Sequence, residues 1–364
     1  MKIAVTFFIS FLAIVATGNG QNSFVLEGMI GKYPVVIKME KEYATYFYKS
    51  KRRDIDLNIS DTNSGKLRLE RVIYGGDKEE VIEVFDLQAY RTGKNAEWRG
   101  TWKSKKGASL PVVLKPIDTT KYDFASVPEL EYDGKVDRIF TKARLSGLQF
   151  IKDSVSRSGQ YEVHWLRERL SGTPMLVIKT GFNANILKRI NAVIRQKSFA
   201  NMNSFFMCTT QGRNEKDGEF ESTIHRYYIS AKYISIETTQ SYDCGGVHPD
   251  AGDISYTIDC GSGKEVTDLD DVFELPVIME NANTRGEGLV QIFTRLYPNE
   301  MKKPASDDDC DYSDPGPWEF PVWFFTQKGL YIAPAFPHAA MPCNFAEFPV
   351  IPWSVLKKYE KKKN

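Results

Sequence analysis

The segment from Cys244 to Phe273 gathers side chains that could do chemistry. His248 lies between a glycine pair and two carboxylates, Asp250 and Asp253. An imidazole beside carboxylates can bind the metal of a hydrolase or act in general acid–base catalysis. The spacing matches no standard zinc motif, so we expect neither a metal nor another cofactor here, and we assign no catalytic residue.

The same residues also have structural uses. Glycine permits a positive φ, and a residue before proline, as His248 is, favours extended backbone, so a sharp turn between strands is expected. We predict that His248 fixes this turn by a hydrogen bond, with a ligand-binding or catalytic role as the alternative. The segment is therefore a candidate binding loop with five named residues: Gly245, Gly246, His248, Asp250 and Asp253.

The cysteines favour disulfides over a reactive thiol. All five lie in the second half of the chain, at Cys208, Cys244, Cys260, Cys310 and Cys343. If the strands on either side of the candidate loop pair, Cys244 and Cys260 fall at opposite ends of a hairpin, too far apart to bond. We predict the pairs Cys310–Cys343 and Cys208–Cys244, which leave one thiol over.

The first 20 residues have the features of a signal peptide. Lys2 precedes an apolar run from Ile3 to Ala16, followed by small residues. Such a run is too short to span a bilayer, so we expect a periplasmic or secreted protein with no transmembrane segment in the mature chain. The chain has 48 basic and 47 acidic residues, and this balance argues against nucleic acid as a partner.

Residues 24–117 read as a small all-β domain, an antiparallel barrel or sandwich. Short runs of strand-forming residues alternate there with polar turns. We expect strands at 33–40, 44–50, 54–60, 66–74, 79–90, 96–102 and 110–116. Residues 118–160 show no clear period and are assigned to a connecting segment.

Residues 161–359 are predicted to form an α+β domain, with an antiparallel sheet packed by helices. The pattern at 184–202 predicts a helix with an apolar face, capped by Asn183 or Asn185. We expect β structure at 204–210, 220–243 and 253–260, helix at 267–273 and 288–301, and strands followed by a short closing helix at 322–359.

Two further patterns allow a binding role but have plainer explanations. Aromatic residues that could stack on sugar rings are equally suited to a strand core: Trp98, Trp102, Trp318, Phe320, Trp323, Phe324 and Phe325. The acidic run Asp307–Asp311 resembles a calcium loop in composition, but it lacks the glycine and terminal glutamate of an EF-hand. We expect a solvated loop there.

The second half of the chain resembles the RsiV-like C-terminal domain, an exported domain found in lysozyme-sensing anti-sigma factors and beside some peptidoglycan deacetylases. The resemblance covers roughly Tyr161 to Tyr359. It rests on the following ordered elements: Tyr242, Gly245-Gly246, His248, the strand DISYTID, Gly263-Lys264, TDLDDVF, and FFTQKGLYIAP with FPVIPWSVLKKY. It implies an α+β fold and an extracytoplasmic binding role. The absence of a membrane helix before this domain departs from the anti-sigma branch.

These observations together predict a non-enzymatic binding protein of the bacterial cell envelope. Its partner would be a lysozyme-like muramidase, another wall-degrading enzyme or toxin, or a peptidoglycan fragment. The alternatives are a metal-dependent or cell-wall hydrolase that uses His248 with Asp250 or Asp253, and a purely structural envelope module.

Overall fold

The computed structural model describes residues 23–61, 65–75, 78–91, 96–210, 217–273, 284–305 and 310–361. The expected signal peptide and residues 307–309 of the acidic run lie outside these residues. In the part of the chain that is described, no helix has both the length and the apolar character needed to cross a membrane.

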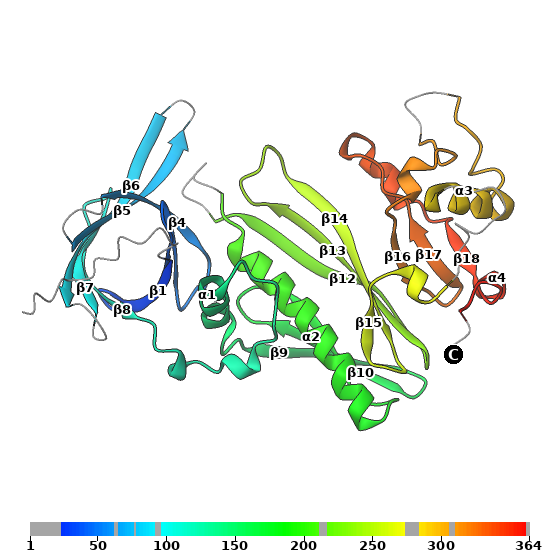
Figure 1. Cartoon of the computed structure of the whole chain (residues 1–364), viewed down its shortest axis with the longest axis horizontal. Coiled ribbons are helices and arrows are strands. Elements are labelled where there is room, and N and C mark those ends of the chain that lie inside the picture. The colour runs from blue at the N-terminus through cyan, green and yellow to red at the C-terminus, as the bar shows by residue number, and fades with distance from the viewer. Residues whose placement is uncertain are drawn as a thin grey trace, which may run out of the picture.

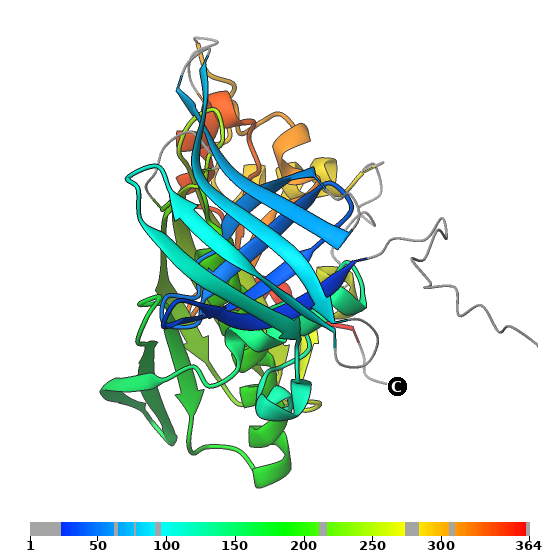
Figure 2. The same cartoon turned by 90° about the vertical axis from the view of Figure 1, so that its left-hand side faces the viewer.

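The N-terminal strands form a closed antiparallel barrel, the first of the two architectures expected (Figure 1 and Figure 2). Pairing of β1 with β8 closes it. The sequence patterns missed β1, because Gly28 interrupts its run of strand formers; a Cβ there would lie 1.9 Å from the carbonyl oxygen of Val113. The strands are β1 Phe24–Ile30, β2 Tyr33–Met39, β3 Tyr43–Tyr48, β4 Ile55–Asp61, β5 Lys66–Gly75, β6 Lys78–Arg91, β7 Glu97–Ser104 and β8 Ser109–Pro116.

Side chains fill the interior of the barrel. Tyr46 and Phe85 are fully buried and meet edge to face, with ring centroids 5.4 Å apart. Glu83 accepts hydrogen bonds from the Tyr46 hydroxyl at 2.7 Å and from Trp102 Nε1 at 3.0 Å. Trp102 and Trp98 pack against this core. Two of the aromatic residues considered for sugar stacking therefore belong to the barrel core.

The segment assigned to a connector at 118–160 contains regular structure. Helix α1 (Lys135–Leu145) packs on the outer face of the barrel, where Phe140 contacts Phe47 at 5.1 Å between ring centroids. Strand β9 (Phe150–Ser158) pairs with β10 (Tyr161–Glu168), so the first sheet of the second half begins inside that segment.

The second half consists mainly of antiparallel sheet with few helices. β9 and β10 form a three-stranded sheet with β11 (Pro174–Ile178). A four-stranded sheet contains β12 (Glu219–Ile229), β13 (Tyr233–Asp243), β14 (Asp250–Asp259) and β15 (Lys264–Val266). A third sheet contains β16 (Val322–Phe325), β17 (Gly329–Ala333) and β18 (Val350–Pro352).

Helix α2 (Ala184–Met207) confirms the helix predicted at 184–202 and is longer than predicted. The side chain of Asn183 caps it by accepting a hydrogen bond from the amide of Ile186 at 3.0 Å. The expectation of β structure at 204–210 is wrong, because the helix continues to Met207 and buries Phe206 in the core beneath it. Tertiary burial of that ring outweighs the local aromatic, strand-like composition.

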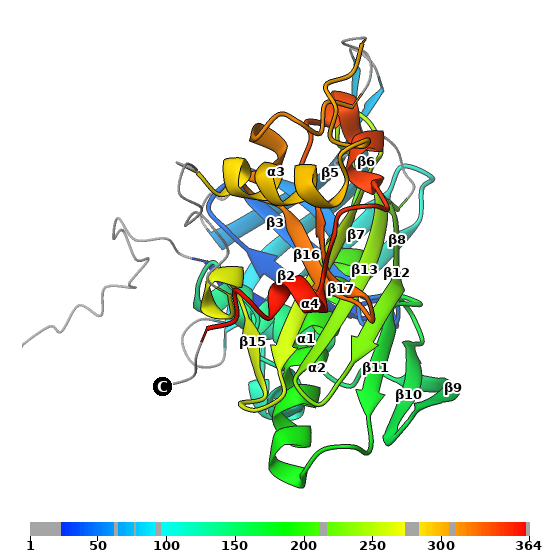
Figure 3. The same cartoon turned by 90° about the vertical axis from the view of Figure 1, so that its right-hand side faces the viewer.

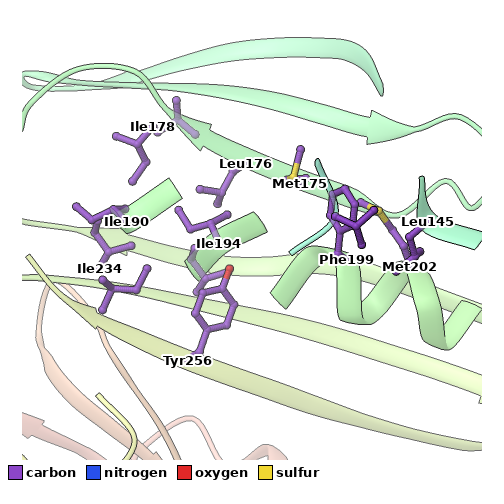
Figure 4. Close-up of a cluster of buried hydrophobic side chains, with 14 of the residues drawn as sticks. Leu145, Met175, Leu176, Ile178, Ile190, Ile194, Phe199, Met202, Ile234 and Tyr256 are labelled. Carbon is purple, nitrogen blue, oxygen red and sulfur yellow. The ribbon is translucent and has the colours of Figure 1, made fainter. Parts of the chain in front are cut away.

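Strand β13 is buried on both faces, which sets the layering of the second half. Ile234 faces α2 and shares one core with Ile194 and Tyr256 (Figure 4). Ile236 belongs to the same core. Tyr233 belongs to the opposite face, where its ring stacks on Phe325 of β16 at 4.4 Å. The four-stranded sheet therefore lies between α2 and the β16–β18 sheet (Figure 1 and Figure 3).

The C-terminal region completes the outer layer. The helix expected at 267–273 is only a 3-10 turn, Leu269–Asp271, capped by Asp268. Helix α3 (Arg285–Leu296) agrees in part with the helix expected at 288–301, and the closing helix α4 (Trp353–Leu356) is present. Trp318, which packs against Phe293 of α3, and Phe325 of β16 are fully buried, whereas Phe320 is 86% exposed.

Two consecutive residues after β3, Arg53 and Asp54, join the barrel to the end of α2. The Asp54 amide donates to the carbonyl of Phe206 at 2.9 Å. Arg53 Nη1 donates to two carbonyls at the helix end, those of Phe205 at 3.0 Å and Cys208 at 2.9 Å. The Asp54 carboxylate forms a buried ion pair with Arg144 at the end of α1. The barrel is thus fastened to both helices at one point.

The Asp54–Arg144 pair predicts a pH dependence of stability. Burial raises the pKa of Asp54 from 3.8 to about 6, against the opposing effect of Arg144. The folded chain then binds a proton that the unfolded chain has released, so the stability contributed by Asp54 is present below about pH 4 and is lost as pH rises through about 6. We expect urea unfolding to show that the free energy of unfolding of the wild type, relative to that of Asp54→Asn, declines by roughly 2–3 kcal/mol between pH 4 and 7. A constant difference would contradict this.

Cys260 should behave as an inert thiol. It is free and 4% exposed, its Sγ lies 3.6 Å from the carbonyl of Ser230, and burial raises its pKa to about 12. We expect no reaction with Ellman's reagent in the native protein at pH 8, and one thiol per chain after unfolding without reductant. Rapid labelling of the native protein would show that this site opens.

Candidate functional site

The candidate loop connects β13 to β14 at one end of the four-stranded sheet. Gly245 adopts a φ of 87°, a conformation that favours glycine. The disulfide Cys208–Cys244 joins the start of the loop to the residue that follows α2, with 4.8 Å between the Cα atoms. The base of the loop is therefore tied covalently to the helix end.

The tip of the loop faces solvent. Val247 is 96% exposed, and Gly246 and His248 are also exposed. His248 Nδ1 lies 3.0 Å from the carbonyl oxygen of Pro249, a contact that a loop-fixing role for this histidine requires. The most accessible side chain of the loop is thus an apolar one, and the sequence analysis did not select it.

Asp250 and Asp253 lie on opposite faces of β14. Residues three apart in a strand point to opposite sides of the sheet. Asp250 Oδ2 accepts from the Tyr242 hydroxyl at 3.2 Å, whereas Asp253 Oδ1 accepts from Thr239 Oγ1 at 2.6 Å. This division disfavours one metal or catalytic centre that uses both carboxylates. Within the described ranges, no group of three or more His, Cys, Asp or Glu residues is placed to hold a metal ion.

Two clefts flank the first half of β14. A cleft of about 660 Å³ is lined by Phe220, Tyr242 and Asp250 among others. A second cleft, of about 360 Å³, is lined by Asp253 and by Tyr331 of β17. Ala251 and Met341 line both, so the two clefts meet beside the candidate loop.

An ion pair missed by the sequence analysis forms one wall of the second cleft. Arg226 of β12 donates to Glu237 of β13 at 2.5 Å and 3.2 Å, and its guanidinium lies over the rings of Phe324 and Tyr331 at 4.5 Å and 5.1 Å. Burial acts to lower the pKa of Arg226, but its hydrogen bonds to Glu237 and the charge of that carboxylate, with a smaller effect of Tyr331, together outweigh burial and raise the pKa. Burial raises the pKa of Tyr331 to about 12. A glutamate at an inward position of β13 was the signal available in the sequence.

The second disulfide fixes the other wall of this cleft. Cys310–Cys343 joins the end of the acidic run to the segment 338–345, which follows β17. The Tyr312 hydroxyl donates to the carbonyl of Cys343 at 3.1 Å, and Asn344 Oδ1 accepts from the amide of Phe336 at 2.6 Å. Both disulfides are the pairs expected from the sequence, and each one braces a wall of the site.

Comparison with known proteins identifies no relative: no family model matches the chain, and no curated protein sequence matches it. The resemblance to the RsiV-like domain therefore rests on the residues quoted for it.

The disulfide at the loop base should contribute strongly to stability. It closes a loop with a sequence separation of 36, for which restriction of the unfolded chain amounts to about 3–4 kcal/mol. We expect Cys208→Ser with Cys244→Ser to lower the free energy of unfolding in guanidinium by about that amount, and to make residues 244–249 sensitive to proteases. The matched control is Cys310→Ser with Cys343→Ser. It removes a disulfide with a similar sequence separation, 33, and should leave residues 244–249 resistant to proteases. Equal cleavage there in both variants would contradict the assigned role.

Proposed function

We propose that this chain is an exported, non-enzymatic binding protein of the bacterial cell envelope. In its most specific version, the proposal is that the protein recognises and neutralises a lysozyme-like muramidase or another wall-degrading enzyme. The observation that carries the proposal is the loop tip. Val247 is almost fully exposed, whereas Cys244, which follows the last paired residues of β13, is bonded to Cys208. An exposed apolar side chain on a braced loop suits recognition by a protein surface.

Two further observations support this function. The disulfides are typical of proteins that fold outside the reducing cytosol, in agreement with the expected signal peptide and with a periplasmic or secreted location. The RsiV-like resemblance, with Gly245 and His248 in the candidate loop, implies an extracytoplasmic binding role for residues 161–359. In this proposal the α+β unit recognises the partner, and the barrel is attached to it through Arg53 and Asp54.

The first test is binding and inhibition. The purified mature protein should form a complex with at least one member of a panel of muramidases, measured by biolayer interferometry, and should slow lysis of cell walls by that enzyme. No complex with any muramidase or with envelope extracts would end the proposal. Hydrolysis of cell walls by the protein itself, abolished in His248→Ala without a change in melting temperature, would instead establish the hydrolase alternative.

The loop tip should dominate the contact. Val247→Ser removes exposed apolar surface without touching a core, so we expect an unchanged melting temperature and at least tenfold weaker binding. The matched control is Val155→Ser, on the exposed strand β9, where the side chain is 42% exposed. Equal affinities for the two variants would show that the loop is not the contact.

A further inference from the structure

Three clefts that share lining residues follow one another around the open end of β12–β14, from one face of the sheet to the other. The cleft of about 660 Å³ shares Phe220 and Glu221 with a third cleft of about 500 Å³, which reaches Trp165 of β10. It shares Ala251 and Met341 with the cleft beside Tyr331. We call these three connected clefts the tip groove. A connected path of this kind suits an extended segment better than a compact small molecule.

Carboxylates dominate the charge of the tip groove. Among the described residues that line it, eight are acidic, against three arginines and one histidine. Two of these carboxylates are in ion pairs within the groove, Asp153 with Arg167 and Glu237 with Arg226. The eight acidic residues are Asp153, Glu219, Glu221, Glu237, Asp243, Asp250, Asp253 and Glu347. The whole chain is nearly neutral, so this acidic excess is a local property of the groove.

The third arginine, Arg53, adds one positive charge at the edge of the groove. Arg53 directs its guanidinium at the carbonyls of Phe205 and Cys208 and lies 3.9 Å from the Phe205 ring centroid. Its hydrogen-bond partners are therefore at the end of α2, and the carboxylate of Asp217 also interacts with its charge.

Aromatic rings accompany the carboxylates along the groove. Phe220 and Tyr242 stack at 6.2 Å with an interplanar angle of 22°, and together they line the central cleft. Trp165 lines one end of the groove, and Tyr331 and Phe345 line the other. Ring faces attract ammonium and guanidinium groups, and carboxylates form their strongest hydrogen bonds with the same cations.

We infer that the tip groove binds a cationic polypeptide segment, with lysine or arginine side chains placed between the carboxylates and the aromatic rings. This inference rests on the proposed function and deepens it, because it names the chemistry of the partner surface. An acidic groove repels anionic polymers and steers basic proteins toward the loop tip. Basic protein partners are therefore favoured over acidic peptidoglycan fragments.

The test compares charge variants of the full mature chain. Glu221→Gln with Glu347→Gln removes two exposed carboxylates from separate clefts of the groove. The matched control, Glu131→Gln with Asp133→Asn, makes the same change of charge at exposed positions before α1, outside the groove. The probes are a cationic lysozyme, the same enzyme with its lysines succinylated, a lysine-rich peptide and a purified muropeptide.

The expected result is binding of lysozyme and of the lysine-rich peptide at 50 mM NaCl that weakens steeply by 500 mM. Succinylation should abolish binding, and the groove variant should bind at least tenfold more weakly than the control. If lysozyme binds the groove variant and the control equally, the inference fails while the proposed function survives. If the lysine-rich peptide binds with this pattern but no muramidase does, the inference stands and the proposed function fails. Binding of the muropeptide alone would overturn the inference.

Discussion

The buried ion pair between Asp54 and Arg144 lies where the barrel, α1 and α2 meet. A buried charge without its partner is costly, so each of these two residues fixes the other in place. Arg53, the residue before Asp54, donates hydrogen bonds to carbonyls at the C-terminal end of α2, and this helix end carries partial negative charge. That helix end is also where Cys208 bonds to Cys244. The position of the candidate loop thus depends on a junction that is made largely outside the loop.

Burial along β13 explains why the site lies at the end of the sheet. Tyr233 to Thr238 are enclosed between α2 and the third sheet, and this enclosure extends to Gln240. Beyond it, Ser241 and Tyr242 are exposed. The same strand therefore supplies a rigid core and an accessible tip. The tip groove follows the boundary between these two environments.

The sequence predicted local features well where composition and periodicity agreed. The α2 helix with its Asn183 cap, the β13–β14 hairpin and most barrel strands follow from such patterns. The extension of α2 through Phe206 did not follow, since it depends on a core that distant strands complete. Strand β1 was missed for a related reason: Gly28 is required by the approach of β8, which is about 85 residues away along the chain.

The candidate site shows the same division. The sequence by itself determined the turn at Gly245 and a set of cysteines that suits two bridges, because these depend on local backbone chemistry and on composition. Only the tertiary structure decided that Asp250 and Asp253 face opposite sides of the sheet, that Arg226 pairs with Glu237, and that separate clefts share their walls. Those relations arise from strand register and layer packing, which bring together residues that no local pattern connects.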